Sequence, residues 1–211
     1  AIEDARDNAL TAFFPEGVYS VSAPLNCMKR SRKHRAEDRW LTNESRKTIA
    51  LAGSTKGKRP VIRLASGCAG FQDAENPQCV IRIWNQENEN TGILPLGAKD
   101  GASTGFNQTF RGIDIDLGQG NPGAIGLGFS GAQGSSLEDV RILARNGYAG
   151  IYNVPGRAMG AVNVEVVGGR FGVIVVTEPS PILAGLTLIN QKERAIKFDG
   201  WTPLTLVGFR I

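Results

Sequence analysis

Short apolar runs recur along the second half of the chain at a nearly constant spacing. Intervals of 24, 22 and 23 residues separate the centres of one set of strand-like segments, Val140, Val164, Leu186 and Phe209. Intervals of 26, 22 and 23 residues separate the centres of a second set, Ile125, Ile151, Val173 and Ile196. Two interleaved sets with one common period predict a solenoid of ~22 to 25 residues per coil, in which stacked coils bury each other's apolar faces.

We therefore expect an all-β fold, a right-handed parallel β-helix (a solenoid) formed by residues 1–211 as a single domain that is incomplete at both ends. Residues 110–211 are expected to form regular coils, and residues 28–109 irregular early coils with long loops. Residues 1–27 are expected to supply a short capping helix and the first strands, because apolar residues at helical spacing precede a Pro-x-Gly turn. An antiparallel sandwich is the alternative, but the two-residue hairpin signals that it needs are scarce.

The outward-facing positions of the regular coils predict two ladders of side chains. Within each ladder, neighbouring side chains are about 4.8 Å apart, which is the spacing of adjacent strands. The first ladder runs through Asp114, Asp139, Asn163, Gly185 and Gly208. The second runs through Asp116, Arg141, Glu165, Thr187 and Arg210. The alternating signs in the second ladder are typical of a structural charge ladder on a solvent-facing surface.

Asp114, Asp116 and Asp139 are nevertheless candidate catalytic residues. Paired carboxylates serve as acid and base around a glycosidic bond. Carboxylate oxygens also suit a calcium ion that neutralises a uronate, which is the calcium role expected in a lyase. The sequence leaves the structural and the catalytic interpretations open.

The distribution of charge and of apolar residues limits the classes of partner that this protein is expected to bind. The net charge of +4 arises mainly from the basic run between Lys29 and Arg39. This run lacks interleaved aromatic residues before Trp40, so we expect a solvated loop and no nucleic-acid partner. No apolar run approaches the ~20 residues of a membrane span, so no membrane partner is expected.

The single histidine, His34, argues against a zinc site, and no resident metal is expected. Three cysteines allow at most one disulfide, and whether Cys68 bonds Cys79 stays open.

Two stretches carry a family resemblance. The run from Phe13 to Tyr19 after the helix resembles the F-P-x-G-x-Y opening of the pectate-lyase-superfamily β-helices. Residues 110–117 and 126–137 resemble the first β-helix of laminarin-degrading exo-β-1,3-glucanases that carry two β-helices. Residues 132–137 stand where that family has an Ala-Gln-x-x-Ser-Leu run. The resemblance covers most of the chain, and its motifs are largely structural.

The resemblance implies a secreted, extracellular, carbohydrate-active protein without a cofactor. The activity implied is that of a glycoside hydrolase acting on a polysaccharide such as a β-1,3-glucan. Gln133 matches a polar position that lines the family's site, and Ser130 stands where the family has a second glutamine. Glu165 joins these two as a substrate-binding candidate from the second ladder. The family's catalytic glutamate lies on a second β-helix that this chain lacks, so a second β-helix domain or a homo-oligomer is an expected partner.

Two other functions stay open. One is a polysaccharide lyase that acts on a uronate polymer. The other is a non-catalytic glycan-binding protein or a structural, tailspike-like β-helix. Three aromatic residues are candidate sugar-stacking platforms, namely Trp84, Tyr152 and Trp201.

Overall fold

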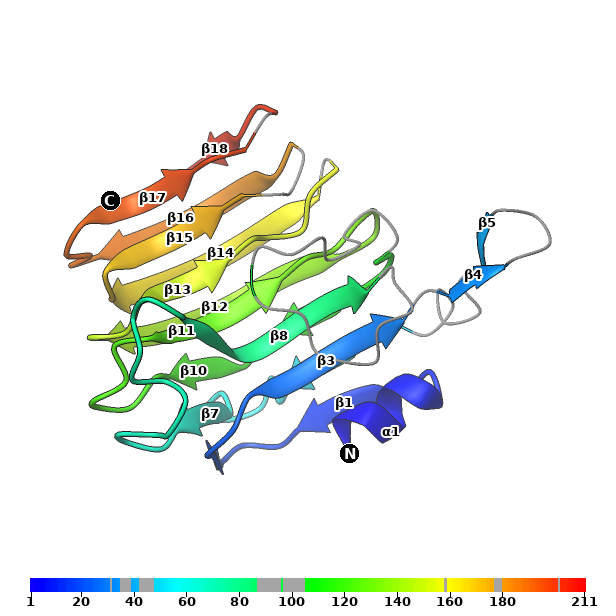
Figure 1. The fold of residues 1–211 in the computed structure, drawn as a ribbon, viewed down its shortest axis with the longest axis horizontal. Coiled ribbons are helices and arrows are strands. Elements are labelled where there is room, and N and C mark those ends of the chain that lie inside the picture. The colour runs from blue at the N-terminus through cyan, green and yellow to red at the C-terminus, as the bar shows by residue number, and fades with distance from the viewer. Residues whose placement is uncertain are drawn as a thin grey trace.

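The computed structural model describes residues 1–30, 32–34, 39–41, 48–86, 96, 105–157, 159–176, 180–200 and 202–211. The described chain is mostly β, and its strands form two parallel sheets that curl around an apolar core (Figure 1). One helix, α1 (Ile2–Asp7), lies at the N-terminus. The expected β-rich fold with parallel pairing and a short N-terminal helix is therefore confirmed.

The larger sheet, called the large sheet below, pairs ten strands in parallel: β1 (Thr11–Phe14), β2 (Val18–Val21), β6 (Ala50–Gly53), β7 (Val61–Leu64), β9 (Thr109–Arg111), β10 (Asp114–Asp116), β12 (Ser136–Arg145), β14 (Gly160–Gly168), β16 (Ile182–Ile189) and β18 (Thr205–Val207). The small sheet contains β3 (Leu25–Arg30), β8 (Gln78–Gln86), β11 (Ala124–Phe129), β13 (Ala149–Tyr152), β15 (Phe171–Val175) and β17 (Arg194–Phe198). A separate antiparallel pair, β4 (Arg32–His34) and β5 (Arg39–Leu41), projects to one side (Figure 1).

From β11 onward the chain visits the two sheets in turn, and each repeat stacks on the one before it (Figure 1). In the large sheet Val140 pairs with Val164, and Val164 pairs with Leu186, as the common period predicts. In the small sheet the prediction was wrong by two residues at one position. Leu127, not Ile125, lies beside Ile151, because Ile125 pairs with Ala149.

The long strands β12, β14 and β16 each have one residue in the left-handed conformation in their interior. These residues are Asp139 (φ 53°), Asn163 (φ 53°) and Gly185 (φ 66°), and the register makes them neighbours. Before this residue, β12 pairs with β9; after it, β12 pairs with β10. Asp, Asn and Gly are the residue types that adopt this conformation at low cost, which explains their recurrence at one place in successive repeats.

Glycines of the small sheet leave room for side chains of the large sheet. Gly126, Gly150 and Gly172 occupy equivalent positions in β11, β13 and β15. A Cβ on Gly126 would lie 2.7 Å from Ile142, and one on Gly172 would lie 3.0 Å from Leu188. The two sheets therefore pack closely along this row because one of them carries no side chain there.

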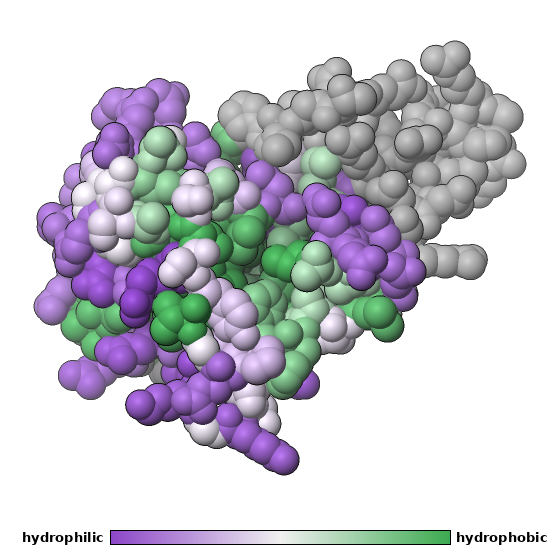
Figure 2. Space-filling view, turned by 90° about the horizontal axis from the view of Figure 1, so that it is seen from below, coloured by the Kyte–Doolittle hydropathy of each residue, from purple (hydrophilic) through white to green (hydrophobic). Residues whose placement is uncertain are grey.

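The N-terminal end of the core is only partly covered. The helix α1 has no buried residue, although Ile2 packs against the core. Phe14, Tyr19 and Leu25 are partly buried beside it. The view from below shows apolar side chains gathered in the centre of this end, within a hydrophilic surround (Figure 2). The capping by α1 is thus incomplete.

Replacing Gly185 tests the row of left-handed residues. A Cβ at this position has its nearest contact with Asn163 at 3.5 Å, so Ala fits, and only its backbone conformation is strained. We expect Gly185→Ala to lower the free energy of unfolding by about 1–2 kcal/mol. Gly185→Asn should cost less than half as much, because Asn accepts the left-handed conformation. Urea unfolding measures both variants, and equal losses for Ala and Asn would show that the conformation does not limit stability.

Candidate functional site

Polar side chains on the outer face of the large sheet form a row across neighbouring strands. This charged row consists of Asp114, Arg141, Glu165, Thr187 and Arg210. Each member follows a left-handed residue by two positions. The first four face away from the core, because the apolar residues on either side of them are buried. Arg141, Glu165, Thr187 and Arg210 confirm the second predicted ladder from β12 onward.

The first rung of both predicted ladders was wrong. The pairing of Ile115 with Ile142 places Asp114 beside Arg141, and Asp116 beside Leu143. Gly112, with φ 65°, stands beside Asp139 in place of the predicted Asp114. The predicted pairing was off by two residues, and such a shift keeps the same side chains facing the core, so alternation alone could not distinguish the two pairings.

Asp114 is the carboxyl of this row with the most unusual environment. Its Oδ1 accepts the Arg141 backbone N–H at 3.0 Å and lies 3.2 Å from the Arg59 Nε. The side chain is 22% exposed. Partial burial raises the pKa of Asp114 above its ordinary value of 3.8, and the Glu165 carboxylate adds to this rise, while Arg141 and Arg59 act against it. Asp114 is thus a partly accessible carboxyl whose pKa lies above its ordinary value.

Arg141 connects this carboxyl to a second one. Its guanidinium Nε lies 2.8 Å from Glu165 Oε1, while its backbone N–H bonds Asp114. One residue therefore holds two carboxyl groups on either side of it. The predicted candidates Asp114 and Glu165 are brought together in this way, although the prediction gave them different roles.

Asp116 lies two residues further along β10 and is committed to ion pairs. Its carboxylate contacts Arg145 Nη2 at 2.8 Å and Arg63 Nε at 3.2 Å. Its side chain is 3% exposed. The hydrogen bond from Arg145 is the main reason why the pKa of Asp116 is lowered. Asp116 therefore ties β7, β10 and β12 together and is closed to a ligand.

Asp139 belongs to the neighbouring row of left-handed residues. Its Oδ1 accepts a hydrogen bond from Asn163 Nδ2 at 2.6 Å, and its backbone carbonyl accepts one from Arg59 Nη1 at 2.8 Å. The side chain is exposed. Asp139 thus stabilises the row of left-handed residues. Its exposed carboxylate serves as a control for the carboxylate of Asp114 in the variants proposed below.

Ser130 and Gln133 lie in the connection between β11 and β12. Ser130 is buried, and its hydroxyl accepts a hydrogen bond from Asn153 at 3.3 Å; Gln133 is exposed. The connection enters β12 at Ser136, which pairs with Gly160, five residues before Glu165. Five residues of strand span roughly 16 Å. The structure therefore does not bring these two residues together with Glu165.

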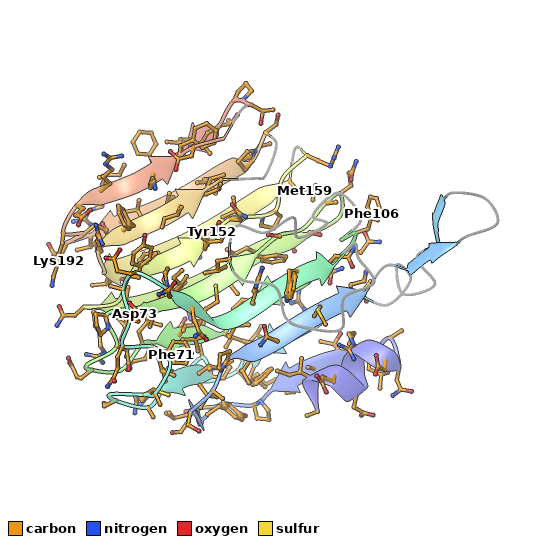
Figure 3. All side chains as sticks on the ribbon, in the orientation of Figure 1. Phe71, Asp73, Phe106, Tyr152, Met159 and Lys192 are labelled. Carbon is orange, nitrogen blue, oxygen red and sulfur yellow. The ribbon has the colours of Figure 1, made fainter. Side chains whose placement is uncertain are left out.

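A second band of polar and aromatic groups lies on the small sheet. The Arg82 guanidinium sits 3.9 Å from the Trp84 ring centre, and Trp84 is buried. Tyr152 packs on a small apolar cluster that is separate from the main core, which places it on the outer face. Figure 3 shows Tyr152 between Phe71 and Asp73 at one end of the strands and Phe106 and Met159 at the other. With Arg82 on its ring, Trp84 is no open stacking platform, and Trp201 lies outside the described residues.

Sequence reasoning missed the arginines that surround the acidic candidates. Arg63 alternates with inward Ile62 and Leu64 on β7, so its outward direction was readable from the period of two. Arg59 lies in a turn whose sequence has no regular alternation of apolar and polar residues. The only nearby signal is Pro60, which indicates that a strand begins after it. The basic run at 29–39 was expected to be a loop, but its described residues belong to β3, β4 and β5, while residues 31 and 35–38 lie outside the described residues.

Cysteine, metal and membrane features can be stated for the described part of the chain. Cys27, Cys68 and Cys79 are free and buried, and burial raises the pKa of Cys79 to about 12. Among the residues that the structure describes, no group of three or more His, Cys, Asp or Glu side chains is placed to hold a metal ion. Within the same residues no helix has the length and apolar character of a membrane span.

The chain was also compared with known proteins. No protein-family model matches it, and searches of curated proteins and of solved structures return no match. Its function must therefore be argued from the residues described above.

Removing the Asp116 carboxylate tests its structural role. Asp116→Asn should lower the free energy of unfolding at pH 7 by about 1–2 kcal/mol, because two arginines lose their partner. A lowered folded-state pKa contributes stability above the ordinary value of 3.8 and loses it as the pH falls further. The deficit should therefore shrink at pH 3 in urea unfolding.

Asp199→Asn is the matched control, since its carboxylate forms an exposed pair with Lys197 at 3.3 Å. That loss should stay below about 0.5 kcal/mol. An Asp116→Asn deficit of the same size at pH 3 and pH 7 would contradict the ion-pair account.

Proposed function

We propose that this chain is a stretch of right-handed parallel β-helix that hydrolyses a polysaccharide outside the cell, with the charged row as its site. The fold is supported by the alternation between two parallel sheets and by the left-handed residue that divides each long strand into two segments. Each repeat then has three strand segments, which suits a coil of three sides. Crossovers between parallel strands are right-handed in almost all proteins, which supports the hand of the coil.

The observation that carries the hydrolase proposal is the arrangement of Asp114 and Glu165 on either side of Arg141. Two strand spacings separate their backbone positions, or roughly 9.6 Å. Inverting glycosidases hold their two carboxyl groups about 6.5–9.5 Å apart, so that a water molecule fits beside the sugar. Both side chains contact Arg141, which brings the carboxyl groups toward that range.

The two carboxyl groups differ in a way that suits two roles. Asp114, whose pKa is raised by partial burial, is the proton donor to the leaving oxygen. Glu165 is the base that takes a proton from the attacking water, and Arg141 fixes its carboxylate in position. The charges on the row also provide hydrogen-bond partners for sugar hydroxyls. Laminarin is the first substrate to test, because the sequence resembles laminarin-degrading glucanases.

Activity assays on single variants test this assignment. Asp114→Asn and Glu165→Gln should each lower kcat on laminarin by about 10²- to 10⁴-fold, which is the usual contribution of acid–base catalysis. Asp139→Asn removes an exposed carboxylate from the adjacent row and should leave kcat within about twofold. New reducing ends report hydrolysis, and ultraviolet absorbance reports the unsaturated products of a lyase.

The pH profile gives an independent check. Activity should fall as the pH rises through the raised pKa of Asp114, because the donor must be protonated. Absorbance with a uronate polymer would replace the hydrolase by the lyase alternative. Full activity in the Asp114→Asn variant would remove the charged row from catalysis, and inactivity of the unaltered chain on every polymer would favour a binding or structural protein.

A further inference from the structure

One bend of the large sheet carries an insertion next to the charged row. Between β9 and β10, Gly112 is two residues from Asp114. In the neighbouring strands the register partners of these residues are Gly53 and Val61, eight residues apart. Residues 54–59 are therefore six extra residues at this bend, and they form an exposed turn with Gly57 at φ 77°. We call this segment the basic turn.

The backbone of the basic turn is well held. Ser54 Oγ accepts the Lys56 N–H at 3.2 Å and donates to the Lys56 carbonyl at 3.0 Å. The Lys58 N–H donates to Glu16 Oε2 at 3.2 Å. Arg59 anchors the end of the turn to Asp114. The turn is thus fixed directly beside the carboxyl that we propose as the proton donor.

The basic turn carries cationic side chains, and two of them form no ion pair within the described part of the chain. Lys56, Lys58 and Arg59 give it a charge of +3. Two carboxylates of the described residues bond to the turn: Glu16 accepts the Lys58 backbone N–H, and Asp114 pairs with Arg59. Arg59 is paired with Asp114, while Lys56 and Lys58 are exposed and form no ion pair within the described part of the chain. The charged row itself holds two carboxylates and two arginines, so the exposed lysines add net positive charge to the surface beside Asp114.

We infer that the basic turn binds an anionic group of the polysaccharide, so that the preferred substrate carries carboxylate or sulfate groups. This inference rests on the proposed function, because it names the class of polymer that occupies the charged row. Beyond Asp114 the row continues to Val61, and the basic turn lies beside this part of the surface because its last residue, Arg59, pairs with Asp114. Exposed ammonium groups attract an anion over about 10 Å at 0.1 M salt, and more weakly as the salt concentration rises. Neutral hydroxyls gain much less from the same groups.

Laminarin and its carboxymethylated and sulfated derivatives test the inference, because they share one backbone and differ in charge. Binding is measured by calorimetry on the full chain with Glu165→Gln, so that hydrolysis does not interfere and Arg59 keeps its pair with Asp114. We expect each charged derivative to bind about three- to tenfold more tightly than laminarin. Lys56→Gln with Lys58→Gln should abolish this preference, and so should high salt. The two derivatives then distinguish carboxylate from sulfate as the preferred group.

Lys192→Gln with Arg194→Gln is the matched control, since it removes two exposed cations from a different corner. The control should keep the preference for charged polymers. Equal binding of neutral and charged laminarin, no binding of any of them, or equal losses in the two double variants would each overturn the inference. A preference without any hydrolysis by the unaltered chain would instead keep the basic turn as a binding site and remove the catalytic proposal.

Discussion

The register between neighbouring strands is set by the apolar side chains that face the core, and the outer face follows from it. Ile115 stacks on Ile142, and Val140 stacks on Val164. Because side chains alternate between the two faces, a shift of one residue would turn buried isoleucines outward and arginines inward. Such a shift would expose several large apolar groups, each of which gains about 1.5–3 kcal/mol from burial. The neighbourhood of Asp114, Arg141 and Glu165 is therefore a consequence of core packing.

Two kinds of small or permissive residue make this packing possible. Glycines of the small sheet admit side chains such as Ile142 from the opposite sheet, and left-handed residues turn each long strand at the same point. Asp139 and Asn163 serve the second purpose and also bond each other. Asp139 and Asn163, the polar residues next to the charged row, thus stabilise the fold, whereas Asp114 is the residue to which we assign a catalytic role. The proposed site and the row of left-handed residues therefore share one surface but use different carboxylates.

Much of the architecture was predictable because it repeats. The common period located β12 to β17, and the order from Arg141 to Arg210 followed from alternation alone. The rung at Asp114 was misplaced by two residues, because both pairings keep Ile113 and Ile115 facing inward and alternation does not distinguish them. Arg59 lies in an aperiodic turn, so nothing in the local pattern connected it to Asp114 55 residues later. Sequence periodicity thus locates the strands. An ion-pair partner that lies in an insertion, such as Arg59, can be identified only from the three-dimensional structure.

The six extra residues at 54–59 show what a bend of this kind tolerates. The strands on both sides of them keep their register with β9 and β10. A loop can therefore be added at such a bend without moving the stack, and the equivalent bends at Asp139, Asn163 and Gly185 are open to the same change. Chemistry on the outer surface can then diversify by local grafting while the scaffold stays constant. For an engineer, these bends are the places to install a new recognition loop.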